Sequence, residues 1–265
     1  MAQKPSKITI IGGGNLGSAI AYGLKKSNFI EASAIYIVDL FTDKLNSLAK
    51  AGFQTSTNNQ EAVKNASIVL LAVKPWQVAD VLAEILPTTT KETILISLAA
   101  GVSFQSLTPL VGDRPIYRVI PNTAVTIGES MTCISAQNTS KEQDLQIEEV
   151  FKQIGEVLFI SEDLMGAATV IASCGTAFAL RYLRASAQGG VESGFASKEA
   201  IRLAAQTMKG AAEMILSSGN HPEEEIDKVT TPGGITIKGL NEMEHNGFSS
   251  SIIKGMMSAL DQVKK

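Results

Sequence analysis

The most constraining feature of this 265-residue chain is a run of glycines between a β-branched segment and a helical one. The stretch KITIIGGGNLGSAIAYGLKKS places Gly12, Gly14 and Gly17 in the pattern G-x-G-x-x-G. In such a pattern the first glycine permits a tight turn, the second lets a pyrophosphate approach the backbone, and the third lets the helix pack on the strand. Free N–H groups at the helix start suit phosphate oxygens. The strand–loop–helix context therefore predicts a dinucleotide-binding domain.

A carboxylate follows where a ribose-binding acid is expected. The apolar segment AIYIVD ends at Asp39, 22 positions after Gly17. An acid near this spacing hydrogen-bonds the ribose 2′-hydroxyl of the cofactor. A 2′-phosphate would meet like charge at Asp39, so the sequence favours NADH over NADPH. NADPH stays an alternative, because Lys44 is near enough in the sequence to assist a phosphate if its loop bends inward.

Further apolar runs, at residues 67–75, 92–101 and 115–121, read as buried strands separated by helical stretches. Such runs are typical of a parallel sheet covered on both faces. MTCISA and GEVLFIS, on either side of a polar helix, are expected to add two more strands. We predict the α/β class: an N-terminal Rossmann-type doubly wound sheet in residues 1–160, followed by an all-α dimerisation domain in residues 161–265.

Ligands of doubly wound sheets gather beyond the carboxyl ends of the strands. Lys74 follows one predicted strand, where it is either a cation beside the phosphates or an ordinary surface lysine. The residues assigned to cofactor binding are Gly12, Gly14, Asn15, Leu16, Gly17, Asp39, Asn59, Ala72, Val73, Lys74, Pro75 and Ala99.

Composition bears on which partners the protein binds and on the cellular compartment expected for it. The formal net charge is −3 and no stretch is strongly basic, so nucleic acid is not expected as a principal partner. Two cysteines match neither a disulfide framework nor a metal site, and no leader pattern precedes the first strand. We expect a cytoplasmic protein without a bound metal. Cys174 could be imagined as a nucleophile, but a small residue for helix packing is the stronger interpretation.

Leu164–Leu180 carries no charge over 17 positions. The segment is short for a membrane span and rich in small residues, so we interpret it as a buried helix, a subunit interface being one setting for it. Together with the Ala-rich stretch Ala204–Ile215, it offers more apolar surface than one small helical domain can bury. We therefore expect a stable homodimer and no membrane association.

Four blocks of the sequence resemble the pyrroline-5-carboxylate reductase family: IGGGNLG, LAVKP, RVIPNT and, most specifically, TTPGGITIKGLNEMEHNGF. The resemblance extends from end to end of the chain. It implies a Rossmann domain and a helical domain that intertwines with its partner in an obligate dimer, often assembled further into rings. It also implies reduction of 1-pyrroline-5-carboxylate to L-proline with NADH or NADPH, the final step of proline biosynthesis.

The resemblance further implies that the Pro-Gly-Gly loop grips the substrate carboxylate. A glycine loop that leads into a helix exposes N–H groups suited to an anion, and Thr231 and Thr236 add hydroxyl donors. We assign Thr236 as the residue at the reacting end, hydrogen-bonded to the ring nitrogen of the product-like state. As an alternative, Thr236 merely caps the following helix. The substrate-binding residues are Asn122, Thr231, Gly233, Gly234 and Thr236.

Two blocks depart from the family's pattern. SCGTAF, at Ser173–Phe178, stands where the family usually shows Gly-Ser-Gly-Pro-Ala-Tyr, and AQGGVESGF replaces Asp-Ala-Gly-Val-x-x-Gly-Leu. These departures leave a non-catalytic NAD(P)-binding protein as an alternative. Another imine or β-hydroxyacid dehydrogenase with the same first domain is the second alternative. Hydroxyacid dehydrogenases of that type use a lysine after a Gly-x-Gly in the helical domain, where this chain offers Arg181.

Overall fold

The computed structural model describes residues 4–263. Within the described residues the chain divides into two compact units, one that runs to Ser173 and takes in Val263, and one from Cys174 to Gln262. The predicted boundary after residue 160 falls at the end of the last strand, and the first helical turns beyond it still belong to the first unit.

The first unit contains an eight-stranded sheet in the order β3-β2-β1-β4-β5-β6-β7-β8. The six strands from β3 to β6 are parallel, β7 is antiparallel to β6, and β8 is parallel to β7. The strand order reverses at β1, beside β4, which is the switch point where ligands of doubly wound folds bind. The strand bounds are β1 Ile8–Ile11, β2 Ile35–Val38, β3 Gln54–Ser56, β4 Ile68–Leu71, β5 Ile94–Ser97, β6 Ile116–Ile120, β7 Ser130–Gln137 and β8 Gly155–Phe159.

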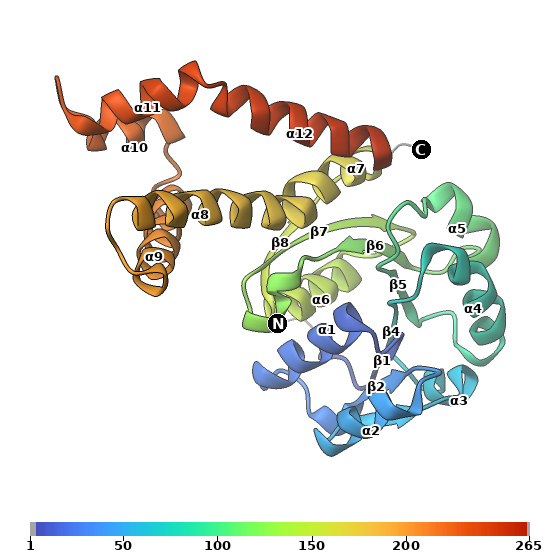
Figure 1. The fold of residues 1–265 in the computed structure, drawn as a ribbon. Helices are drawn as coiled ribbons and strands as arrows, with labels where there is room; N and C mark the ends of the chain where they lie inside the picture. The colour runs from blue at the N-terminus through green and yellow to red at the C-terminus, as the bar shows by residue number, and fades with distance from the viewer. Residues whose placement is uncertain (1–3, 264–265) are drawn as a thin grey trace. The chain divides into compact units, whose positions relative to one another are not determined.

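Helices cover both faces of this sheet, with α1 and α6 on one side and α4 and α5 on the other (Figure 1). Alternate residues of one strand enter two separate cores: Ile68 belongs to the core that includes residues of α1, α2 and α6, and Val69 to the core that includes residues of α3, α4 and α5. Every residue of β1, β4, β5 and β6 is buried, which explains their near-continuous apolar runs. The helix bounds are α1 Asn15–Lys26, α2 Thr42–Lys50, α3 Asn59–Val63, α4 Val78–Ile85, α5 Phe104–Val111, α6 Lys141–Lys152 and α7 Met165–Ala168.

The predicted α/β class and Rossmann-type sheet are confirmed, with two additions. Strand β3 was not predicted, because its three residues, QTS, are too few and too polar to give a strand pattern. The reversal of β7 follows from its short connection, residues 121–129, since a parallel crossover needs a dozen or more residues. Short 3-10 turns complete this unit: η1 Ala32–Ala34, η2 Pro75–Gln77, η3 Leu86–Thr88, η4 Thr123–Ile127 and η5 Glu162–Leu164, with a π-helical turn, η6, at Thr169–Cys174.

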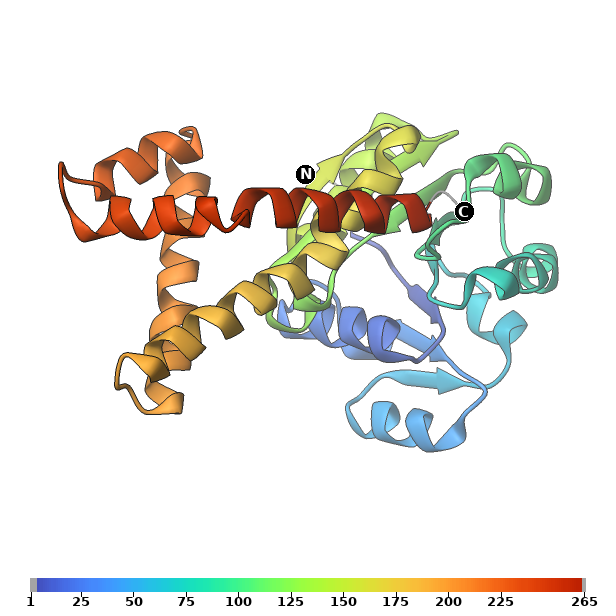
Figure 2. The ribbon, with the colours of Figure 1, turned by 45° about the horizontal axis from the view of Figure 1, so that its top comes forward.

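The second unit is built from helices alone (Figure 2). Gly190 of α8 packs closely on Ala200 of α9, where an added Cβ would lie 3.0 Å from the alanine Cβ. Gly219 ends α9 in a left-handed conformation, Ser197 is the first residue of α9, and Ala196 is its N-cap. The bounds are α8 Gly175–Glu192, α9 Ser197–Ser218, α10 Pro222–Val229, α11 Ile235–His245 and α12 Phe248–Val263.

Residues 162–192 form a helical run that is, by length and composition alone, apolar enough to cross a membrane. Its beginning is buried in the sheet unit, at Met165, Val170 and Ala172. Farther on, Leu180 is 59% exposed in the single chain. Within 174–262, the residues classed as buried are Ala187, Ala200 and Glu225. The helical unit therefore leaves most of its apolar surface open, and a subunit interface there stays a prediction.

Candidate functional site

The glycine loop joins β1 to α1 and passes very close to the end of β4. Gly12 has a φ of 110°, and a Cβ at this position would lie 2.4 Å from the carbonyl oxygen of Ala72. Its N–H donates to the carbonyl of Val38 at 2.8 Å. Only glycine fits here, because both the backbone conformation and the contact with β4 exclude a side chain.

Gly17 lies where the protein itself leaves no room for a side chain, whereas Gly14 lies on an open face of the loop. A Cβ on Gly17 would lie 2.0 Å from the carbonyl oxygen of Gly12, so the helix could not remain against the loop. A Cβ on Gly14 would meet no atom within 4 Å, because this face of the loop is open. Gly14 is also the N-cap of α1 and supplies no side-chain cap. The first turn of α1 therefore presents backbone N–H groups to an open surface, which suits a phosphate.

Asp39 lies directly beside this loop, at the end of β2. One carboxylate oxygen, Oδ2, accepts the N–H of Gly13 at 2.9 Å, and the other, Oδ1, accepts the N–H of Phe41 at 3.0 Å. The side chain is half-buried. Each oxygen keeps a lone pair for another donor, so a carboxylate fixed in this way could accept the hydroxyls of a ribose.

A hollow of about 430 Å³ opens beside Gly13 and Gly14. Lys44 lines it, and the Lys44 ammonium lies 5.2 Å from the centroid of the Phe41 ring. The loop after β2 therefore does bring this lysine to the glycine loop, as the alternative of NADPH binding requires. The hollow is lined by Gly13, Gly14, Asn15, Ser18, Ala19, Tyr22, Lys44, Ser47, Leu48 and Thr126.

Seven lining residues were not singled out from the sequence: Gly13, Ser18, Ala19, Tyr22, Ser47, Leu48 and Thr126. Tyr22 lies one helical turn after Ser18, so the spacing of α1 could have indicated it. Ser47 lies similarly one turn after Lys44 on α2. Thr126 belongs to η4, far along the chain, and no local pattern could place it here.

The remaining cofactor candidates follow β4 and β5 or begin α3. Ala72 lies against Gly12, and Pro75 opens η2. The exposed Lys74 donates its backbone N–H to Gln77 Oε1 at 3.1 Å. The buried Ala99 follows β5, and the amide of Asn59 donates to Glu84 Oε2 at 2.8 Å, which ties α3 to α4. Their contact with a cofactor stays a prediction.

Asn122 follows β6 and is held at both ends of its side-chain amide. Oδ1 accepts the N–H of Ala124 at 2.9 Å and caps η4, while Nδ2 donates to the carbonyl of Ala172 at 3.0 Å. The substrate role assigned to Asn122 stays a prediction, and the structure adds a clear structural role.

The Pro-Gly-Gly turn precedes α11 in the helical unit. Gly233 has a φ of 71°, and the N–H of Gly234 donates to the carbonyl of Thr231 at 2.9 Å. Gly234, without a side chain, is the N-cap of α11, and the exposed Thr236 is the second residue of the helix. The alternative in which Thr236 caps this helix is therefore wrong. The uncapped start of α11 offers backbone N–H groups beside a threonine hydroxyl, an arrangement that suits a carboxylate.

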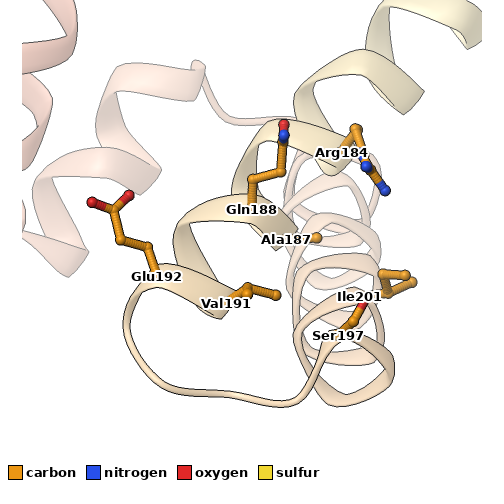
Figure 3. Close-up of a pocket in the computed structure, with 7 residues that line it drawn as sticks. All are labelled: Arg184, Ala187, Gln188, Val191, Glu192, Ser197 and Ile201. Atoms are coloured by element: carbon orange, nitrogen blue, oxygen red, sulfur yellow. The ribbon is translucent and has the colours of Figure 1, made fainter.

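A second hollow, also about 430 Å³, lies in the helical unit between the end of α8 and the start of α9 (Figure 3). It contains none of the predicted site residues. Gln188, which belongs to the block that departs from the family pattern, lines it together with Arg184, Ala187, Val191, Glu192, Ser197 and Ile201.

Titratable groups do not form a metal site in residues 4–263, where no cluster of three or more His, Cys, Asp or Glu side chains occurs. Burial raises the pKa of the Cys133 thiol, so this cysteine is protonated at neutral pH.

Two family models match the two parts of the chain. Residues 7–101 match the model described as NADP oxidoreductase, coenzyme F420-dependent, and residues 162–265 match pyrroline-5-carboxylate reductase dimerisation. The chain is also 41% identical to pyrroline-5-carboxylate reductase 2 of Dictyostelium discoideum, over 97% of this chain and 92% of that one. The chain belongs to the pyrroline-5-carboxylate reductase family.

Other relatives agree with this membership. Pyrroline-5-carboxylate reductase 1 of the same organism is 40% identical over 96% of this chain, which spans only 49% of that longer relative. The crystal structure of Plasmodium falciparum pyrroline carboxylate reductase with NADP bound has a TM-score of 0.88. It is 28% identical, and 97% of each chain is covered. These matches cover both the sheet part and the helical part of this chain.

Proposed function

We propose that this chain reduces 1-pyrroline-5-carboxylate to L-proline with hydride from NAD(P)H. One observation carries the proposal: the open face of Gly14 at the start of α1, beside a carboxylate that the loop itself holds. These residues fit a dinucleotide, since the loop leaves room for a pyrophosphate and Asp39 is fixed for ribose hydroxyls. Many dehydrogenases share such a domain, and family membership points to the cyclic imine as the substrate of this one.

The bound nicotinamide would supply the hydride, and the protein's own residues would bind and orient the substrate. The N–H groups at the start of α11 and the hydroxyl of Thr231 would hold the substrate carboxylate. Thr236 would hydrogen-bond the ring nitrogen as it becomes an amine. A protonated imine already accepts electrons, so positioning supplies most of what catalysis requires. This explains why a catalytic histidine or carboxylate pair is not needed.

A spectrophotometric assay tests the proposal. We expect the purified protein to oxidise a reduced nicotinamide cofactor only when a cyclic imine carboxylate is supplied. No turnover with either cofactor, together with oxidation of a hydroxy acid, would replace this function by that of a hydroxyacid dehydrogenase. Cofactor binding without turnover of either substrate would indicate a non-catalytic protein.

We expect kcat/KM to be higher with NADH than with NADPH. The glycine loop holds Asp39 where the ribose would lie, and a 2′-phosphate there would meet its charge. Asp39→Ser should shift the preference toward NADPH by about tenfold, the value of one lost interaction with a charged group. Lys44→Ala is the matched variant, since it lines the same hollow and should lower only the use of NADPH.

Steady-state kinetics with both cofactors provide the measurement. A lower KM for NADPH than for NADH in the wild-type protein, or an unchanged preference in Asp39→Ser, would show that Asp39 is not the selector.

We further propose a homodimer that does not dissociate at working concentrations, with rings of such dimers as its extension, in the cytoplasm and without membrane or nucleic-acid partners. In the single chain Leu180 is 59% and Ile253 60% exposed, and both belong to the helical unit. A second copy would remove this surface from water. Light scattering at low micromolar protein should give at least the dimer mass. A monomer mass would contradict the proposal.

A further inference from the structure

An ion pair between a buried arginine and a partly exposed glutamate lies in the sheet unit, and neither residue is assigned to cofactor or substrate. Arg118, on β6, is only 8% exposed, and its Nη1 donates to Glu162 Oε1 at 2.6 Å. Its neighbours in register are Ser97 of β5 and Ser135 of β7, both buried. Within residues 4–263 the Nε atom of Arg118 has no hydrogen-bond partner. The guanidinium is thus committed to one carboxylate.

Glu162 joins three segments of the chain. Besides Arg118, its Oε1 accepts the backbone N–H of Phe104, the first residue of α5, at 2.5 Å. A carboxylate at this end of a helix is favoured by the helix dipole. The guanidinium also lies 5.9 Å from the centroid of the Phe104 ring. Strand β6, the start of α5 and the turn η5 therefore meet at one ion pair.

Stability alone does not explain such a pair. Burying the Arg118 guanidinium costs solvation free energy, and a well-packed apolar residue of similar volume is often equally stable. The pair does provide a fixed direction, because the carboxylate must satisfy the guanidinium and the Phe104 N–H together. The role of the pair therefore lies in the segment that it fixes.

That segment is the turn of residues 98–103, between β5 and α5. Its first residue is held by the sheet, since the N–H of Leu98 donates to the carbonyl of Leu71 at 3.1 Å. Its far end is held where Glu162 binds Phe104. Between them lie Ala99, assigned to cofactor binding, and the exposed Gly101 with a φ of 78°. Loss of the Glu162 contact would remove one of the contacts at this far end and leave the Ser103 cap of α5 and the packing of the buried Phe104.

The same short stretch of sequence holds the helical run at a second point. Asn122 lies four residues after Arg118, and its amide donates to Ala172 within the π-helical turn Thr169–Cys174. Turns of this type occur often at functional sites. The RVIPN stretch thus fastens residues 162–173 near both ends, at Glu162 and at Ala172.

We propose that Arg118, acting through Glu162, is a positioning residue for hydride transfer. The turn of residues 98–103 follows β5, which lies on the other side of β1 from β2 and Asp39. If the pyrophosphate and ribose lie at the Gly12–Gly17 loop and Asp39, a dinucleotide across the switch point would bring its nicotinamide end to this turn, whose position the pair sets. This inference rests on the proposed function, since the turn matters for turnover only if hydride transfer takes place there.

Glu162→Ala, Glu162→Gln and Arg118→Met test the inference against Tyr117→Phe. Glutamine keeps an oxygen that can accept the Phe104 N–H, whereas alanine removes it. Tyr117 is the matched control: it precedes Arg118 in β6, is fully buried, and its hydroxyl donates to Asp144 Oδ1 at 2.7 Å. It belongs to the core on the other face of the sheet, so Tyr117→Phe removes a part-buried hydrogen bond without touching Glu162.

We expect kcat to fall about tenfold to a hundredfold in Glu162→Ala and Arg118→Met, as for reacting atoms that are displaced slightly. The dissociation constant for NADH, from fluorescence titration, should stay nearly unchanged, and Glu162→Gln should recover most of kcat. Tyr117→Phe should lower the melting temperature and leave kcat alone. An unchanged kcat in Glu162→Ala, or a glutamine variant no better than alanine, would overturn the inference.

Hydrogen exchange separates this inference from the proposed function. The amides of residues 99–104 should exchange faster in Glu162→Ala than in the wild type, with no such change in Tyr117→Phe. This readout needs no turnover, so it stands even if the wild type proves inactive with pyrroline-5-carboxylate. Unchanged exchange in this turn would overturn the positioning role whatever the assay shows.

Discussion

Gly17→Ala is expected to lose both stability and cofactor binding, whereas Gly14→Ala is expected to lose cofactor binding alone. A Cβ on Gly17 would lie 2.0 Å from the Gly12 carbonyl oxygen, so α1 must move away from β1. Overpacking of this kind costs about 1–3 kcal/mol or more. Gly14 has a φ of −72° and a ψ of −170°, which alanine adopts without strain, and no atom lies within 4 Å of the added Cβ.

The Gly14 substitution acts only where the pyrophosphate would approach. Loss of one contact with a charged group corresponds to about 1.5–3 kcal/mol, so we expect NADH affinity to fall about tenfold to a hundredfold. Thermal unfolding without cofactor and fluorescence titration with NADH measure the two effects separately. Wild-type affinity in Gly14→Ala would show that the pyrophosphate does not pass over this residue. A wild-type melting temperature in Gly17→Ala would show that α1 can shift freely.

Thr236→Ala is expected to lower kcat/KM for pyrroline-5-carboxylate about tenfold to a hundredfold, as one lost hydrogen bond to a charged group of about 1.5–3 kcal/mol implies. Thr236 is the exposed second residue of α11, and Gly234 occupies the N-cap. The substitution should therefore change stability by only about 0.5 kcal/mol, as at other surface positions. Affinity for NADH should be unchanged, since Asp39 and the glycine loop belong to the other unit.

Thr236→Ser is the matched variant for this test, because it keeps the hydroxyl and removes only a methyl group. It should retain most of the wild-type efficiency. A Thr236→Ala protein with wild-type kcat/KM would refute the substrate role, whatever its melting temperature. Equal losses in the serine and alanine variants would show that packing of the methyl group, and not the hydroxyl, is responsible.

The fold class could be read from local sequence because each element carries its own pattern. The four-residue strands β1, β4 and β5 are buried on both faces and so are apolar throughout. Strand β3 could not be found in this way, since its residues are polar and its place at the edge leaves it partly exposed. The direction of β7 was available from the short connection after β6 but not from the residues of β7 themselves.

The binding loop was predictable for a related reason: its chemistry is local. Gly12 and Gly17 are required by contacts within one strand–loop–helix unit, and Asp39 follows the next strand at a spacing that the sheet geometry fixes. Thr236 was located by its place after the Pro-Gly-Gly turn. Its relation to the start of α11 needed the structure, which showed that Gly234 is the N-cap.

Contacts between distant segments were decided by the tertiary structure alone. Thr126 lines the hollow beside Gly14 because η4 lies next to α1, and no local sequence pattern indicates this position. Arg118 and Glu162 are 44 positions apart and read separately as a charge in a strand and a surface acid. Hydrophobic periodicity and turn residues are local properties of a segment, so the sequence alone determined most helices and strands and the glycine loop. Which side chains meet depends on packing across the sheet, and only the folded chain decided that.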